Sequence, residues 1–312
     1  MKYLSIVLTI ILLTWSSCTA QDSFDWLEYP NEVHFVDIAN GETIAYTDEG
    51  TGSQIIVMIH GLGSYLPGWK HNTEELKDAF RVIAIDLPGY GKSSKKAEHY
   101  SIPFFSESVV QFLEALFVDD VVLAGHSMGA QISIYTALNY PEKVNSLVLS
   151  APAGFETFSD EAEQAFRMMI STESIMATDE EMIRFNLVSN FHEFPEEAAF
   201  MIEDRIAMME DPEFENYARA QAESVFAMLE TPVFDELTDL KQPVLVIFGK
   251  QDQLIPNRML HPHLTTEDVA KTGVNRIENA ELVWIEEAGH FVHFEKPKPF
   301  NKAVKEFLNQ RR

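Results

Sequence analysis

Short apolar runs recur along this chain, and they restrict its fold more than any other feature. Six runs of four to five residues consist almost wholly of apolar side chains, which is typical of strands buried on both faces of a sheet. Helical patterns separate many of these runs, for example at residues 104–117 and 130–139. Such alternation predicts a mostly parallel sheet with helices on both faces. The runs cover residues 55–59, 82–85, 121–124, 146–149, 244–248 and 282–285.

A hairpin precedes these runs. Residues 33–38 and 43–47 have strand character and flank Asn40-Gly41, a dipeptide that favours a tight turn between antiparallel strands. We therefore expect an eight-stranded sheet with an antiparallel hairpin at one edge.

The alternation of strand and helix stops between residues 153 and 232. This segment has the pattern of several amphipathic helices and holds 19 Asp and Glu, 4 Arg, no Lys and 8 of the 12 Met. We interpret it as a helical lid inserted after the sixth strand, which divides the α/β core into residues 21–152 and 233–312. Because thioether side chains adapt to varied apolar ligands, we expect the methionines to line a substrate site.

The balance of charge excludes two classes of partner. The net charge is −26 and the pI is near 4.6, whereas non-specific binding to nucleic acid needs clustered Lys and Arg. Attraction to an anionic membrane surface needs the same excess of positive charge. We expect no nucleic-acid partner, and we interpret the acidic surface as a means of keeping the protein soluble.

The first 20 residues have the pattern of a secretory signal. Lys2 precedes an apolar run at residues 3–15, and small or polar residues follow it. The run is shorter than the roughly 20 apolar residues of a transmembrane helix. We therefore expect export, either to a bacterial cell envelope or into the medium.

Cys18 is the only cysteine, so the sequence offers no disulfide. Its position after the apolar run and two serines resembles the lipid-attachment site of bacterial lipoproteins. Trp15 departs from that pattern, which usually has an aliphatic residue there. Two alternatives follow: lipidation of Cys18 and anchoring to a membrane, or cleavage after Ala20 and release of a soluble protein.

The strongest chemical signal is Gly125-His126-Ser127-Met128-Gly129, between the apolar run at residues 121–124 and the helical pattern that begins at Ala130. A strand, a sharp turn and a helix are the setting of a nucleophilic serine. Side chains two residues before or after the serine would collide with the neighbouring strand and helix. The pattern predicts that Ser127 is a nucleophile.

A nucleophilic serine needs a base, because its hydroxyl is hardly ionised at neutral pH. His290 follows the last predicted strand, with His293 as its nearest competitor, and Asp252 follows the strand at residues 244–248. The order Ser127, Asp252, His290 is that of nucleophile, acid and base in this architecture. We predict that His290 is the general base and that Asp252 orients it.

The tetrahedral intermediate of acyl transfer also needs hydrogen-bond donors for its oxyanion. His60-Gly61-Leu62-Gly63 follows the strand at residues 55–59. We predict that the backbone N–H groups of Leu62 and Met128 form the oxyanion hole, and that His60 is a structural residue of its loop.

Together these motifs resemble the successive signatures of the α/β-hydrolase superfamily over residues 33–310. Ala151-Pro152-Ala153-Gly154 and the helical lid are similar to monoacylglycerol-lipase-like and related esterase members. The resemblance implies an α/β-hydrolase fold and ester hydrolysis through an acyl-enzyme, without cofactor or metal. The segments that carry it are His60–Gly63, the sequence DLPGYGKS at residues 86–93, the serine motif, the sequence GKQD at residues 249–252, and Gly289-His290.

Three other chemistries do not fit the sequence. The stretch Gly91-Lys92-Ser93 lacks the first glycine of a phosphate-binding loop, because Asp86 stands in its place. His261 and His263 have no further ligand at a familiar metal spacing. Haloalkane dehalogenases and epoxide hydrolases use an aspartate where this chain has Ser127.

The expected substrates are carboxylic esters with an apolar acyl or alcohol group, such as small esters and monoacylglycerols. One alternative is a carbon–carbon bond hydrolase of the same fold, which should bind the carboxylate of its substrate through a basic residue. Another is a non-catalytic ligand-binding member. The sequence carries no signal for an oligomeric state. The basic residues of the predicted lid are Arg167, Arg184, Arg205 and Arg219.

Overall fold

The computed structural model describes residues 24–311, so the predicted signal segment with Cys18 lies outside the described residues. None of the helices in this range is long and apolar enough to cross a bilayer.

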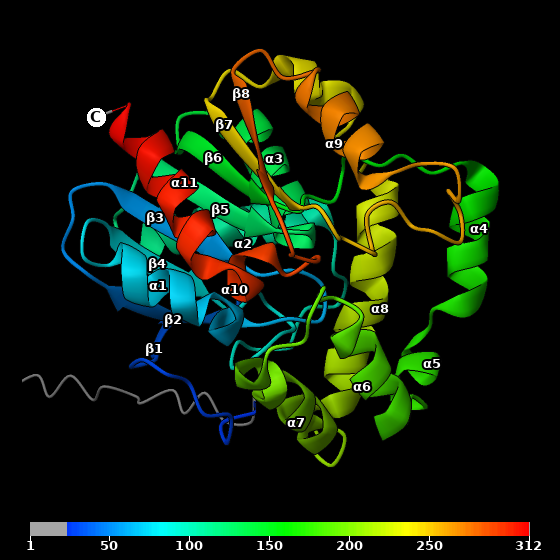
Figure 1. Cartoon of the computed structure of the whole chain (residues 1–312). Coiled ribbons are helices and arrows are strands. Elements are labelled where there is room, and N and C mark those ends of the chain that lie inside the picture. Colours follow the sequence, from blue (N-terminus) through cyan, green and yellow to red (C-terminus); the bar gives the residue numbers. More distant parts are fainter. Residues whose placement is uncertain (1–23, 312) are drawn as a thin grey trace, which may run out of the picture.

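One eight-stranded sheet forms the centre of the molecule (Figure 1). Its strands lie in the order β1-β2-β4-β3-β5-β6-β7-β8. The pairs β1–β2 and β2–β4 are antiparallel and the other pairs are parallel. This confirms the predicted sheet with a hairpin at one edge. The strands are β1 (His34–Asp37), β2 (Thr43–Glu49), β3 (Ile55–Ile59), β4 (Arg81–Ile85), β5 (Val121–His126), β6 (Val144–Ser150), β7 (Val244–Gly249) and β8 (Ala280–Ile285).

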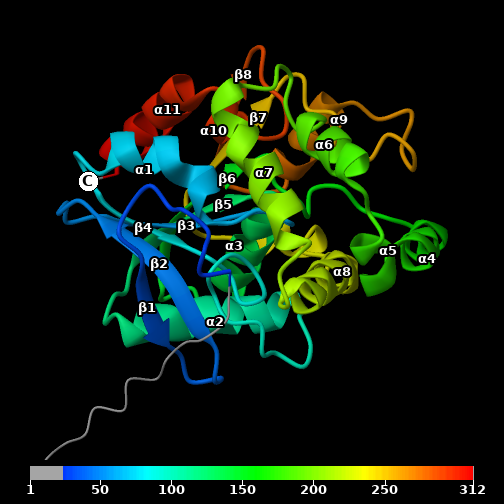
Figure 2. The same cartoon turned by 90° about the horizontal axis from the view of Figure 1, so that it is seen from below.

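Helices cover both faces of the sheet, as predicted (Figure 2). Successive residues of one strand point to opposite faces: Ile56 and Met58 of β3 pack into the core on one side, and Val57 and Ile59 into the core on the other. Both faces are therefore apolar, which explains the continuous apolar runs. One face is covered by α1 (Lys70–Leu76), α10 (Val292–Glu295) and α11 (Pro297–Asn309), the other by α2 (Ile102–Ala115), α3 (Met128–Asn139) and α9 (Thr266–Val274).

Some predicted boundaries were wrong by a few residues. The helix expected at residues 104–117 begins at Ile102, because the Ser101 hydroxyl accepts a hydrogen bond from the Phe104 N–H at 3.1 Å and caps it. It ends at Ala115, and Phe117 has a positive φ of 55° and is 94% exposed. The helix expected from Ala130 begins at Met128. Strands β6 and β8 each begin two residues earlier than predicted.

Helices occupy the chain between β6 and β7, and none of residues 151–243, all of which are described, belongs to a strand. We call α4–α8 the helical insertion; it extends from the lower centre to the right of Figure 1. Its longest helix, α8, buries Tyr217 and Ala220 in the main core. The helices are α4 (Asp160–Met169), α5 (Thr172–Met176), α6 (Glu180–Val188), α7 (Ala199–Met208) and α8 (Phe214–Glu230).

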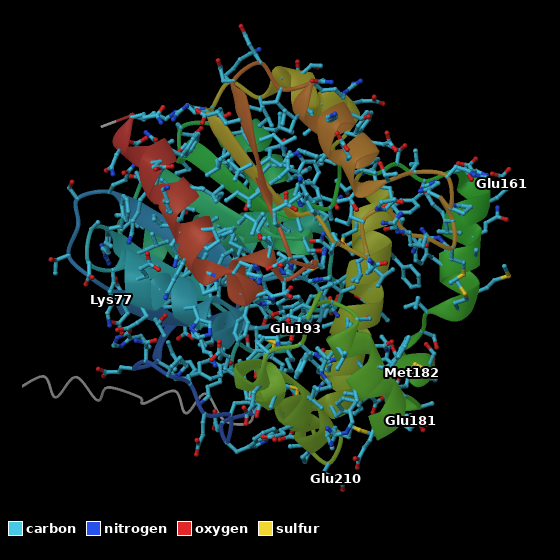
Figure 3. All side chains as sticks on the ribbon, viewed as in Figure 1. Lys77, Glu161, Glu181, Met182, Glu193 and Glu210 are labelled. Carbon is cyan, nitrogen blue, oxygen red and sulfur yellow. The ribbon has the colours of Figure 1, made fainter. Side chains whose placement is uncertain are left out.

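The methionines of the insertion differ in exposure: Met201 and Met208 are buried, whereas four others are exposed. Met168, Met169, Met176 and Met182 are 41–82% exposed, so the expectation that these four line a substrate site was wrong. Met182 and the acidic Glu161 and Glu181 project from the outer side of the insertion (Figure 3). Helix α4, all of which is described, buries only Ala162, although its Arg167 pairs with Glu230 of α8 at 2.7 Å.

Candidate active site

Ser127 stands at a sharp turn between β5 and α3, with φ 50° and ψ −114°. A non-glycine residue in this region is strained by about 1–3 kcal/mol, and such strain collects at functional sites. The flanking glycines make the turn sterically possible. A Cβ on Gly125 would lie 2.3 Å from the Gly129 carbonyl oxygen, and a Cβ on Gly129 would lie 2.4 Å from that of Ile59. The structure therefore explains both glycines by close backbone contacts.

The hydroxyl of Ser127 is not used to stabilise the helix that follows it. Serine is favoured before a helix because its oxygen usually accepts a hydrogen bond from the first turn. Within the described chain, however, Ser127 precedes α3 without a side-chain capping bond, and the residue is half-buried. The hydroxyl is thus available for chemistry.

The structure brings Asp252 and His290 together at the ends of neighbouring strands β7 and β8. Nδ1 of His290 donates a hydrogen bond to Oδ2 of Asp252 at 2.9 Å, and both residues are buried. The other oxygen of Asp252 accepts from the N–H groups of Leu254 at 2.8 Å and Ile255 at 3.0 Å. These bonds fix the carboxylate, and the bond at Nδ1 leaves Nε2 of His290 as the nitrogen that can take a proton.

The loop of His290 also contacts the serine turn directly. His126, the residue before Ser127, donates from Nε2 to the carbonyl oxygen of His290 at 3.1 Å. The two imidazole rings lie 4.8 Å apart between their centroids. The structure therefore places the three predicted residues Ser127, Asp252 and His290 at one edge of the sheet.

The predicted oxyanion donors lie on neighbouring loops. Strands β3 and β5 are parallel neighbours that pair Ile59 with Gly125, so the loops that leave their carboxyl ends are adjacent. Within residues 24–311, the N–H groups of Leu62 and Met128 donate no hydrogen bond. Buried N–H groups nearly always have a hydrogen-bond partner. The N–H of Met128, which is buried, is therefore suited to donate to an oxygen of a bound substrate.

Three further histidines are buried near this site and are neutral. His60 donates from Nδ1 to the Gly61 carbonyl at 2.8 Å and accepts at Nε2 from the Leu87 N–H at 3.0 Å, and burial lowers its pKa to about 4. Burial and neighbouring histidines also lower the pKa of His126 and of His293. His293 contacts the Ser150 hydroxyl at 3.2 Å. Asp252 therefore pairs with His290 and not with the competing His293.

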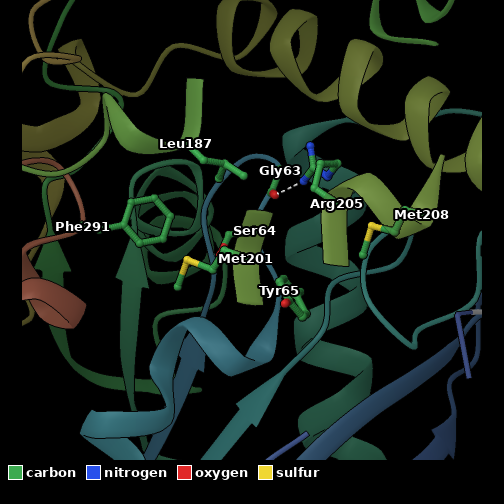
Figure 4. Close-up of a pocket in the computed structure, with 8 residues that line it drawn as sticks. All are labelled: Gly63, Ser64, Tyr65, Leu187, Met201, Arg205, Met208 and Phe291. Carbon is green, nitrogen blue, oxygen red and sulfur yellow. Dashed lines mark hydrogen bonds between the residues drawn. The ribbon is translucent and has the colours of Figure 1, made fainter. Parts of the chain in front are cut away.

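A pocket of about 270 Å³, part of it open to solvent, adjoins both predicted catalytic loops (Figure 4). Gly63 directly follows the predicted oxyanion donor Leu62, and Phe291 directly follows His290. Two methionines of the insertion, Met201 and Met208, line the pocket. The remaining lining residues are Ser64, Tyr65, Leu187 and Arg205.

Helix α7 binds the loop after β3 through two side chains whose roles the sequence did not reveal. Arg205 donates from Nη2 to the carbonyl of Gly63, and Asp204 accepts from the hydroxyl of Tyr65. Arg205 also donates to Gln221 at 3.4 Å. Both acceptors of Arg205 are neutral, so its positive charge is not compensated by a hydrogen-bonded acid.

Asp86 directly follows β4 and binds the loop after β3 at Leu66. Its Oδ1 accepts from the Leu66 N–H at 2.6 Å, and its Oδ2 accepts from the Tyr29 hydroxyl at 2.5 Å and the Lys92 N–H at 2.8 Å. Burial raises the pKa of Asp86 to about 6. The sequence placed Asp86 in one of the segments that resemble the family and used it to exclude a phosphate-binding loop, but it did not reveal this role in holding the loop.

Comparison with known proteins assigns the family. The sequence model of the family described as alpha/beta hydrolase fold matches residues 54–297. A 2-hydroxy-6-oxononadienedioate/2-hydroxy-6-oxononatrienedioate hydrolase of Burkholderia vietnamiensis is 28% identical over 284 residues, which cover 86% of this chain and 91% of that protein. A crystal structure of a probable hydrolytic enzyme from Pseudomonas aeruginosa has a TM-score of 0.81 at 27% identity, covering 90% of this chain and 96% of the other.

A longer protein is also similar. The dihydrolipoyllysine-residue acetyltransferase component of the acetoin cleaving system of Pseudomonas putida is 29% identical over 267 residues, which cover 84% of this chain. The matched region spans only 65% of that relative's length.

The serine turn should tolerate no side chain at its second glycine. Gly129→Ala should lower the free energy of unfolding by at least about 3 kcal/mol or prevent folding. The added Cβ would collide with the backbone carbonyl oxygens of Ile59 and His60, which cannot move aside as a flexible side chain could. Gly41→Ala is the control: its φ is 91° and a Cβ would meet nothing within 4 Å, so it should cost about 1–2 kcal/mol. Urea denaturation compares the two, and equal losses would contradict the steric explanation.

The neutral histidines should make stability depend on pH. The folded pKa of His60 is about 4 and its unfolded value is about 6.5, so the unfolded state binds more protons between these values. The stability contributed by His60 is fully present above pH 6.5 and is lost as pH falls toward 4, at about 1.4 kcal/mol per pH unit. His60→Gln should show a shallower decline in urea denaturation from pH 7.5 to 4.5. Parallel curves for variant and wild type would contradict this.

Proposed function

Because the chain belongs to the alpha/beta hydrolase fold family, we propose that it is a serine hydrolase that cleaves carboxylic esters with an apolar acyl or alcohol group. One observation carries the proposal. The 2.9 Å bond between His290 and Asp252 leaves Nε2 of His290 as a base, on a loop hydrogen-bonded to the turn that holds Ser127. A serine, a base and an orienting acid together suffice for nucleophilic acyl transfer.

The proposed reaction has two steps. The hydroxyl of Ser127 attacks the ester carbonyl while Nε2 of His290 takes its proton, and the same proton then passes to the leaving alcohol. Asp252 stabilises the imidazolium that forms between these transfers. Water then attacks the acyl-enzyme with His290 again as base, which releases the acid and restores Ser127. The N–H groups of Leu62 and Met128 stabilise the negative oxygen of each tetrahedral intermediate.

The pocket supports a largely apolar substrate. Leu187, Met201, Met208 and Phe291 contribute apolar surface to it. An acyl chain or apolar alcohol that covers these side chains gains about 25 cal/mol for each Å² removed from water. The thioethers can adapt to groups of different shape.

Hydrolysis of nitrophenyl esters with acyl chains of two to sixteen carbons tests the proposal. Ser127→Ala should lower kcat at least 10⁴-fold and abolish labelling by a fluorophosphonate. Ser133→Ala, on the helix that follows Ser127, is the control: among residues 24–311 the Ser133 hydroxyl donates only to the carbonyl of Gly129, so activity should persist. Folded wild-type protein that neither hydrolyses an ester nor reacts with the fluorophosphonate would favour the ligand-binding alternative.

A second candidate function is hydrolysis of a carbon–carbon bond in an acidic substrate. Of the four arginines of the helical insertion, all of them within the described chain, only Arg205 lines the pocket. Its neutral partners leave its charge able to attract a carboxylate. The relative from Burkholderia vietnamiensis carries the name of a dioate hydrolase. A dioate has two carboxylates, however, and the pocket offers one arginine, so we place ester hydrolysis first.

A matched pair of substrates separates the two candidates. If the natural substrate is acidic, Arg205→Gln should lower kcat/KM for a 2-hydroxy-6-oxo-dienoic acid at least tenfold more than for a neutral ester of similar size. Any effect of Arg205 through the Gly63 carbonyl acts on both substrates alike, so the ratio of the two losses isolates recognition of charge. Equal losses, or no turnover of the acid by wild type, would exclude this candidate.

A further inference from the structure

We propose that Glu295 is a positioning residue for the general base and that it ties the loop of His290 to the helical insertion. The inference rests on the proposed function, because it concerns the same site. Glu295 ends the short helix α10, five residues after His290. Neither the predicted catalytic set nor the pocket lining includes it.

The carboxylate of Glu295 joins two segments that lie about a hundred residues apart in sequence. Its Oε2 accepts from the N–H of Gly289 at 2.7 Å, directly before His290. The same oxygen accepts from the N–H of His192 at 3.1 Å, and Oε1 accepts from the N–H of Glu193 at 2.7 Å. In Figure 3, Glu193 is labelled at the junction between the insertion and the part of the molecule that contains α10. One side chain therefore binds the base loop and the insertion at once.

Close packing makes this junction specific. A Cβ on Gly289 would lie 2.6 Å from the backbone nitrogen of His192 and 2.7 Å from the carbonyl oxygen of Asn190. That carbonyl accepts from the N–H of Phe291 at 3.1 Å. The rings of Phe191 and Phe291 stack at 5.2 Å. A backbone hydrogen bond at Phe291 and close packing at Gly289 thus hold the residues on both sides of His290 against the segment 190–193.

The charge of Glu295 matters because all three of its partners are donors. A carboxylate offers only acceptor positions, and hydrogen bonds to it are stronger than those between neutral groups. A glutamine has one carbonyl oxygen, and its NH2 group would face an N–H instead of accepting from it. Replacement by glutamine keeps the shape of the side chain but leaves at least one of the three donors without an acceptor.

Asp252 fixes the imidazole of His290 from the side of the sheet, whereas Glu295 fixes its backbone from the side of the insertion. The nitrogen that takes the proton must be held within a fraction of an ångström of its productive place. A displacement of about 1 Å can cost about 100-fold in rate. Through Glu295, the helical insertion therefore contributes to kcat as well as to substrate binding.

The test compares Glu295→Gln and Glu295→Ala with the wild-type full chain. We expect kcat for the best nitrophenyl ester to fall about tenfold in Glu295→Gln and about 30- to 100-fold in Glu295→Ala, with KM changed less than threefold. Hydrogen–deuterium exchange should accelerate together in peptides that cover residues 187–195 and 286–292. A merely structural role would lower the melting temperature and leave kcat unchanged.

Glu287→Gln is the matched control. Glu287 lies on the same loop and is exposed, and within the described part of the chain its carboxylate pairs only with the ammonium group of Lys296, at 3.6 Å. Its variant should therefore keep wild-type kcat and exchange. If Glu295→Ala does not fold, the isosteric glutamine variant decides the question. A kcat of Glu295→Gln within twofold of wild type, or faster exchange in only one of the two segments, would overturn the proposal. If the wild type neither hydrolyses esters nor reacts with a fluorophosphonate, the proposed function itself fails, and this inference fails with it.

Discussion

Two backbone segments pass so closely at the serine turn that no side chain fits between them, and this constraint sets the geometry of the site. A Cβ on Gly129 would lie within 2.5 Å of the carbonyl oxygens of Ile59 and His60. The same contact holds the helix that begins after Ser127 against the end of β3, from which the oxyanion loop leaves. Ser127, with its strained φ of 50°, lies in the turn between the two glycines that make these close backbone contacts. The proposed nucleophile and the proposed oxyanion donors are therefore positioned together.

The helical insertion forms a wall of the pocket and also contacts two loops of the proposed catalytic site. Helix α7 binds the oxyanion loop through Arg205 and Asp204. The segment 190–193 binds the base loop through Asn190 and Glu295. The two contacts lie on opposite sides of Ser127 along the edge of the sheet, one next to β3 and the other next to β8. A rigid movement of the whole insertion away from the core would break both contacts. Smaller movements of single side chains or loops at the pocket would leave both contacts intact.

The parts of the site that could be predicted from the sequence are those fixed by local patterns. Gly125 and Gly129 flank Ser127 between a strand and a helix, and Asp252 and His290 each follow an apolar run, so each residue could be placed at a strand end without knowing its partners. The role of Glu295 could not be predicted in this way, because it binds backbone N–H groups, and every non-proline residue has one. The exposure of Met168 and Met182 escaped prediction for a related reason. Helical periodicity identifies an apolar side of a helix, but not whether another element covers it. The early start of α2 did have a local signal, the cap at Ser101.

The distribution of charge limits how the pocket can discriminate between substrates. The chain carries a net charge of −26, and this field opposes the approach of an anion. Exposed charges farther away than about 8 Å are largely screened at physiological ionic strength. Arg205 lies at the pocket itself, and among residues 24–311 its hydrogen-bond acceptors are the neutral Gly63 carbonyl and Gln221. The field of Arg205 would therefore act on a substrate in this pocket at short range and with little screening. In the proposed site, recognition of charge would therefore depend on one side chain of α7, and the same side chain also holds the loop after β3. A substitution of Arg205 that changed the preferred charge of the substrate would also remove its hydrogen bond to the Gly63 carbonyl. Specificity and rate would then change together, because both depend on this side chain.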